Sequence, residues 1–195
     1  MKIRLWLLLC ALVAAPATAA LVRPLGVDAL VERASVIALG TVSASNSQWR
    51  EGRVVTTVRL RVERAVKGEA ADEVTLVTLG GTVDGIGQRV SGAPVFAVGE
   101  QVVVFLEPVG KAAELRVVGM AQGKLRVEPD LTGGRVVRDL SGLSFAEVDP
   151  SGAVQPAAAP VEAMPLDAFL ASLVTRIHAP VAPTLAPPAA PTVAP

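Results

Sequence analysis

The sequence predicts a mostly β domain, a five- to six-stranded barrel with a short N-terminal helix and a C-terminal helix. First, Val58, Leu60 and Val62 alternate with polar residues within the segment 53–68, and this period of two is typical of a strand with one buried face. Second, valine is the main apolar residue of the central region, and valine favours strands. Third, short apolar runs recur between glycine-rich turns, a pattern typical of barrels.

Residues 1–20 are predicted to be a signal peptide. Lys2 and Arg4 precede an apolar run that ends in Ala17-Thr18-Ala19, which is the order of a basic region, an apolar region and a small-residue cleavage site. The run is shorter than the about 20 apolar residues of a membrane-spanning helix. We therefore expect cleavage after Ala19 or Ala20, no transmembrane anchor, and an exported bacterial protein that is periplasmic or extracellular.

Cleavage would remove Cys10, the only cysteine, and would leave 16 basic and 18 acidic residues. An exported chain without disulfides must depend on its core alone, which suits a bacterial envelope protein. A nearly neutral chain is also a poor general ligand for phosphate backbones.

The domain is expected over residues 21–138. Residues 27–34 place apolar side chains at helical spacing and predict a short amphipathic helix. Residues 36–42 predict the first strand, in which Gly40 indicates a bulge or bend. The polar segment 43–52 is predicted to be a turn-like connection, and its Trp49 is interpreted as a buried plug over the barrel end, with an exposed contact residue as the alternative.

After the strand at 53–66, residues 73–79 predict the third strand, and residues 80–92 predict a long glycine-rich loop, a kind of loop that usually carries function or mobility. The apolar run within 101–107 predicts a central strand covered on both faces, and Phe96 is expected in the core. The remaining predicted strands are 114–118, 124–127 and an edge hairpin at 133–138.

The C-terminal part is predicted to contain one ordered element. Residues 139–164 are predicted to be an irregular connector, and residues 165–178 an amphipathic helix with one apolar face. Residues 179–195 consist almost entirely of Pro, Ala, Val and Thr, a composition typical of an extended, disordered tail.

The residue inventory does not indicate catalysis, a metal or a cofactor. His178 is the single histidine, so a catalytic triad or a three-histidine zinc site within one chain is excluded. The glycines at 80–87 are not followed by the Lys-Ser/Thr of a phosphate-binding loop. Asp84 offers one carboxylate, whereas calcium takes about six to eight oxygen ligands. The arginines of the 53–66 strand lack the aromatic residues with which single-stranded nucleic acid stacks.

The segments ASVIALGTV at 34–42, VKG at 66–68 and VGEQVVVFL at 98–106 stand in an order that resembles the netrin-like module of tissue inhibitors of metalloproteinases. The chain resembles still more closely uncharacterised exported bacterial proteins with the same pattern. The resemblance covers residues 25–127 and implies a barrel of the oligonucleotide/oligosaccharide-binding type. Those inhibitors chelate the protease zinc through an N-terminal cysteine, which the mature chain lacks, so the resemblance implies the fold but not the inhibitory mechanism.

The function expected from the sequence is that of an exported, non-enzymatic binding module for a protein or an envelope polymer. The expected binding surface comprises the glycine-rich loop and Trp49, with Asp84, Gln88 and Arg89 as contact residues. The alternative is a metalloprotease inhibitor that inserts this loop without a cysteine. A third hypothesis is a hydrolase, which would bring Asp72, Glu73, Asp84 and Glu100 together in a pocket.

Overall fold

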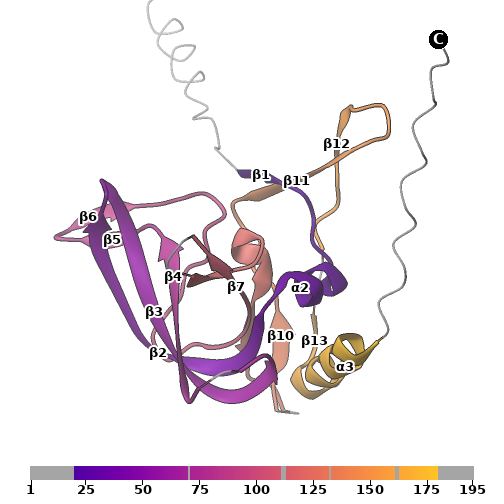
Figure 1. Cartoon of the computed structure of the whole chain (residues 1–195), viewed down its shortest axis with the longest axis horizontal. Coiled ribbons are helices and arrows are strands. Elements are labelled where there is room, and N and C mark those ends of the chain that lie inside the picture. Colours follow the sequence, from indigo (N-terminus) through magenta and orange to yellow (C-terminus); the bar gives the residue numbers. More distant parts are fainter. Residues whose placement is uncertain (1–19, 70, 111–112, 132, 161–162, 180–195) are drawn as a thin grey trace, which may run out of the picture.

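Over the residues that the structure describes, the protein is mostly β with two α-helices, α2 (Val27–Arg33) and α3 (Leu166–His178), as Figure 1 shows. This computed structural model describes residues 20–69, 71–110, 113–131, 133–160 and 163–179. The predicted fold class and both predicted helices are confirmed. The predicted signal peptide before Ala20 and the predicted tail after Ala179 lie outside the described residues. Among the described helices, none is long and apolar enough to cross a membrane.

The main sheet has eight strands in the order β13-β10-β9-β7-β2-β3-β4, with β8 paired to β7 off this path, and every pairing is antiparallel. A strand lies in every predicted range, but 133–138 contains the single strand β10 and not a hairpin, and the sheet has eight strands where five or six were expected. Their bounds are β2 (Val36–Arg50), β3 (Arg53–Lys67), β4 (Glu73–Leu79), β7 (Gln101–Val109), β8 (Glu114–Val117), β9 (Lys124–Glu128), β10 (Arg135–Val137) and β13 (Ala163–Pro165).

The hairpin of β2 and β3 is much longer than expected. The segment 43–52, predicted to be a turn-like connection, is mostly strand, and only Glu51 and Gly52 form the turn, both with positive φ. The prediction was wrong because this half of β2 extends beyond the core. Its polar side chains are stabilised by pairing with β3 rather than by burial, so composition does not reveal the strand.

The sheet curls because β2 is bulged. Its register with β3 shifts at three places, one of them between Leu39 and Gly40, and each bulge bends and twists a strand. The bulge predicted at Gly40 is therefore confirmed. The curl brings β4 beside β8, but no ladder joins these two strands. The expected barrel is thus a curled sheet whose edges meet without backbone pairing.

Replacing Gly40 by alanine is expected to lower the free energy of unfolding by about 2 kcal/mol, since overpacking a tight site carries a cost of this size. A Cβ at this position would lie 2.4 Å from the carbonyl oxygen of Arg61 and 2.9 Å from Cγ of Leu60. Urea unfolding measures the change. The control is Gly87→Ala, at a strand glycine whose added Cβ would meet nothing closer than 3.7 Å; equal losses in both variants would contradict the steric argument.

The central strands bury both faces, as predicted for β7. One face packs against α2 and α3, and Phe105 of β7 meets Phe169 of α3 edge to face, with ring centroids 6.5 Å apart. The other face lines the interior of the curled sheet, and Phe96 lies in this second cluster as expected. The residues of that interior cluster are Val36, Ala38, Val42, Val58, Leu60, Val74, Leu76, Phe96, Val102, Val104, Leu106 and Val117.

The prediction of an irregular connector at 139–164 was wrong. This segment contains β11 (Leu143–Val148), β12 (Val154–Pro156) and most of β13. β11 pairs in parallel with β1 (Ala20–Val22), and the β11–β12 hairpin projects from the main sheet (Figure 1). β13 pairs with β10, so residues 133–138 are not the edge that was predicted. These strands bury few side chains, so they carry no clear periodic signal of their own.

Candidate binding surface

The segment predicted as a glycine-rich loop contains a short hairpin. Strands β5 (Gly81–Val83) and β6 (Ile86–Gln88) flank Asp84 and Gly85, whose φ angles are 50° and 79°. Two positive φ angles in a two-residue connection characterise the type I′ turn, and Asp-Gly between apolar residues is its strongest sequence signal. The prediction of one long loop over residues 80–92 was therefore wrong, although the sequence contained this signal.

The β5–β6 hairpin is fastened to the outer half of the β2–β3 hairpin, and Figure 1 shows the two together at one end of the molecule. Gly81 fits so closely that an added Cβ would lie 2.2 Å from Oγ of Ser47 and 2.4 Å from Oγ1 of Thr56. The Thr56 hydroxyl donates to the carbonyl oxygen of Gly80 at 2.6 Å. These contacts hold the base of the hairpin in one position.

Trp49 lies on this outer half of β2, two residues before its turn. Its cross-strand partner Val54 is fully buried, whereas Trp49 itself is 49% exposed. The prediction of a buried plug was therefore wrong, because β2 carries Trp49 beyond the end of the core. Phe96, at 7% exposure, fills the interior instead.

The structure uses the predicted contact residue Gln88 to fasten β6 to β3. Gln88 accepts a hydrogen bond from the backbone N–H of Val54 at 2.6 Å, and Val54 is the cross-strand partner of Trp49. The half-buried Gln88 thus fixes β6 to the part of β3 that pairs with the outer half of β2. Its side-chain oxygen is used within the protein, so Gln88 acts as a positioning residue.

The other two predicted residues lie along the hairpin itself. Asp84 is exposed in its turn, and Arg89 is exposed directly after β6. Ile86, at 58% exposure, lies between them and was not predicted. We call Trp49, Asp84, Ile86 and Arg89 the hairpin surface. Its mixture of exposed apolar and charged side chains on paired strands is typical of an interaction site.

An ion pair anchors the end of β2 that carries the hairpin surface. Nη1 of Arg50 lies 2.5 Å from Oε1 of Glu114, the first residue of β8. The hydrogen bond from Arg50 lowers the pKa of the Glu114 carboxyl below its ordinary value, since it stabilises the ionised form. The charged pair thus links the β2–β3 hairpin to the opposite edge of the curled sheet.

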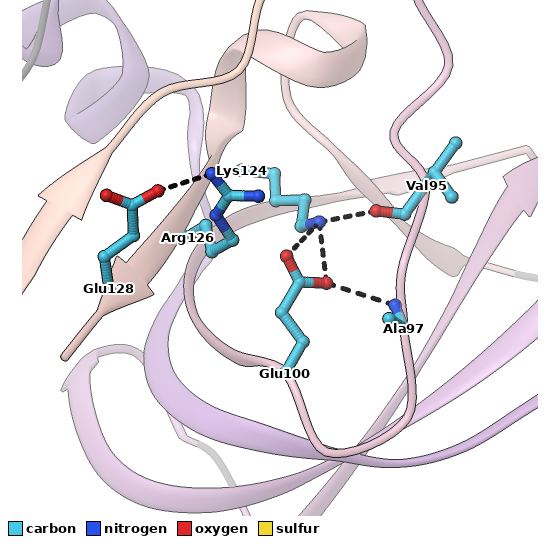
Figure 2. A network of polar contacts seen from close by, with 6 residues as sticks. All are labelled: Val95, Ala97, Glu100, Lys124, Arg126 and Glu128. Atoms are coloured by element: carbon cyan, nitrogen blue, oxygen red, sulfur yellow. Dashed lines mark hydrogen bonds and ion pairs between the residues drawn. The ribbon is translucent and has the colours of Figure 1, made fainter.

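A second polar network holds the segment that carries Phe96 (Figure 2). Nζ of Lys124 donates to both carboxylate oxygens of Glu100, at 2.7 and 2.9 Å, and to the carbonyl oxygen of Val95 at 2.5 Å. Glu100 in turn accepts from the backbone N–H of Ala97 at 3.1 Å. The Lys124 ammonium lies 4.7 Å from the ring centroid of Phe96. The network therefore holds in place the segment from which Phe96 enters the interior cluster.

A cavity of about 570 Å³ adjoins this network. It is open to solvent and lies between β9 and the neighbouring turns. Its lining residues are Gly99, Glu100, Gln101, Arg126, Val127, Pro129, Asp130 and Gly133. Because Glu100 is bonded to Lys124, the carboxylate stabilises the fold at this position.

The carboxylates considered for hydrolysis lie in different environments. Glu100 is bonded to Lys124, Glu73 accepts from the hydroxyl of Ser43 at 3.3 Å, and Asp84 occupies the hairpin turn. Within the described ranges, no group of three or more His, Cys, Asp or Glu side chains is placed to hold a metal ion. The hairpin surface is therefore the candidate functional site among the described residues.

Comparison of the sequence with protein-family models and with curated proteins finds no match.

Proposed function

We propose that this protein is an exported, non-enzymatic binding module that recognises a protein or an envelope polymer through the hairpin surface. The observation that carries the proposal is the half-exposed indole of Trp49 on a paired strand, beside a hairpin fixed at its base. Tryptophan combines a large apolar area with a polar N–H group, and this is why it is enriched at binding sites.

The rigidity of the surface supports the same proposal. Both hairpins have two-residue turns, and the contacts of Gln88 and Gly81 hold one hairpin against the other. A surface ordered before its ligand arrives loses less conformational entropy on binding. Arg89 and Asp84 add charges of opposite sign on either side of Ile86, which favours a ligand with both polar and apolar groups.

The alternative is a metalloprotease inhibitor that works without an N-terminal cysteine. The projection of the β5–β6 hairpin favours it, since a narrow, rigid hairpin can enter a protease cleft. Inhibition of a secreted metalloprotease by the wild-type protein, lost when residues 81–88 are replaced by a short turn, would support this alternative.

Replacing Trp49 by alanine is expected to weaken ligand binding by about thirtyfold, which is the size of a typical interface hot spot. Trp49 is the only tryptophan after residue 20, so its fluorescence in the mature protein reports directly on the surface. We expect a blue shift on titration of the wild type with purified cell-wall polymer or with a captured envelope protein. Trp49→Ala has no tryptophan left after residue 20, so the loss of affinity in Trp49→Ala and in Ile86→Ser is measured by titration calorimetry.

The matched control is Val98→Ala, at a position that is 65% exposed outside the hairpin surface. This variant should bind like the wild type. Unchanged binding by both Trp49→Ala and Ile86→Ser would exclude the hairpin surface as the binding site.

A further inference from the structure

The seam where β4 lies beside β8 leaves backbone groups unpaired. The backbone N–H of Val62 donates to the carbonyl oxygen of Asp72, and the N–H of Gly80 donates to that of Val54. Every second residue of β4 therefore directs its backbone groups toward β3, namely Val74, Leu76 and Thr78. The N–H and C=O groups of Val77 and Leu79 consequently face away from β3, toward the seam. No strand in the described part of the chain pairs with β4 along this edge.

The facing edge of β8 has the same property. The backbone N–H of Val118 donates to the carbonyl oxygen of Phe105. Given the register of β8 on β7, the N–H and C=O groups of Arg116 therefore point toward β7. The N–H and C=O groups of Leu115 and Val117 therefore face the seam. Unpaired backbone groups on a strand edge are a template for an added extended segment.

A pocket of about 300 Å³ opens at this seam. Val77, Leu79 and Val117, whose backbone groups are unpaired, all line it, and Val109 and Met120 add apolar side chains. This volume is at the lower end of the range of small-ligand sites. Unpaired backbone groups and apolar side chains thus face one small, accessible space.

The charged groups of the pocket favour an anion. Nε of Arg116 is buried and has no hydrogen-bond partner, and Nη2 lies 3.8 Å from Glu114, whose carboxylate is bonded to Arg50. The only carboxylate on the lining is that of Glu107, and Arg33 is bonded to it at 3.0 Å. Buried polar groups are nearly always paired, and the Arg116 side chain is 39% exposed, so a ligand can reach its guanidinium.

We propose that this seam pocket binds the C-terminal end of an extended, apolar peptide. The peptide backbone pairs with the free edge groups of Val77, Leu79 or Val117, an apolar side chain occupies the space beside Val109, and the terminal carboxylate pairs with Arg116. A carboxylate suits a guanidinium because the two form paired, charge-assisted hydrogen bonds. The seam pocket shares no residue with the hairpin surface, so its test is independent of the proposed function.

The test uses the mature protein and the peptide acetyl-Ala-Val-Val, with a free carboxylate or as the C-terminal amide. We expect the acid to perturb the amide resonances of Val77, Leu79 and Val117 and to bind about tenfold more tightly than the amide, because only the acid pairs with Arg116. Arg116→Met should reduce the affinity for the acid to that for the amide. The control is Arg61→Met, at an exposed arginine of β3.

Two further measurements keep the proposal falsifiable. Val109→Trp is expected to fill the pocket and abolish binding, with an unchanged melting temperature as evidence that the protein is folded. Sodium decanoate tests a lipid carboxylate as the occupant: binding tighter than that of the peptide would overturn the proposal. Equal affinity for acid and amide, or perturbations confined to residues outside the seam, would overturn it as well.

Discussion

Replacing Phe105 by alanine is expected to lower the free energy of unfolding by about 3–5 kcal/mol, the usual range for a buried Phe→Ala change. Phe105 is fully buried on β7 and contacts Phe169 edge to face. The substitution therefore opens a cavity between the sheet and α3 and also removes an aromatic pair. Denaturant unfolding followed by far-UV circular dichroism measures the change.

The position of Phe105 makes a matched comparison possible. Phe105→Leu keeps much of the volume but loses the ring pair, and we expect it to be clearly less destabilising than the alanine variant. Phe169→Ala removes the partner, so a double-mutant cycle isolates the coupling between the two rings. A loss below about 1 kcal/mol for Phe105→Ala would mean that the packing of α3 on the sheet contributes little to stability.

Replacing Lys124 by methionine is expected to lower the free energy of unfolding by about 3 kcal/mol. The side chains of Lys124 and Glu100 are only 14% and 13% exposed, and removing one partner leaves the other charge poorly solvated. The change also removes the donor to the carbonyl oxygen of Val95 and the cation over Phe96. We place the effect at the lower end of the range for buried pairs because both side chains retain some water contact.

Two measurements separate this effect from a general loss of packing. Glu100→Gln combined with Lys124→Met should cost less than the sum of the single changes, since neither charge is then left alone. Amide hydrogen exchange should increase mainly in the segment around Phe96, which the network holds (Figure 2). Additive losses in the cycle would contradict the role assigned to the Lys124–Glu100 pair.

Several elements were predictable because their signal is local. β3 carries the alternation of Val58, Leu60 and Val62, and β7 carries a continuous apolar run covered on both faces. α3 presents Phe169, Leu170 and Leu173 to the core at helical spacing. In each case one element buries enough of its own apolar side chains for the period to show in the sequence.

The candidate surface was only partly predictable. The sequence singled out Trp49, Asp84, Gln88 and Arg89, but not the exposed Ile86 between them. The Asp84-Gly85 pair is a hairpin signal that the prediction of a long loop did not use. The position of Gln88 beside the partner of Trp49 depends on the packing of β6 against β3, which no local pattern encodes.

Side-chain periodicity determined by itself that this chain forms a mostly β domain with a helix near each end, and that its central strand is covered on both faces. Tertiary structure alone decided how far β2 extends, that β11, β12 and most of β13 lie within the segment 139–164, and that β4 meets β8 without a ladder. The physical reason is that these features depend on backbone pairing and bulges between strands. Any residue except proline can make such pairs, so the composition of the paired segments does not record them.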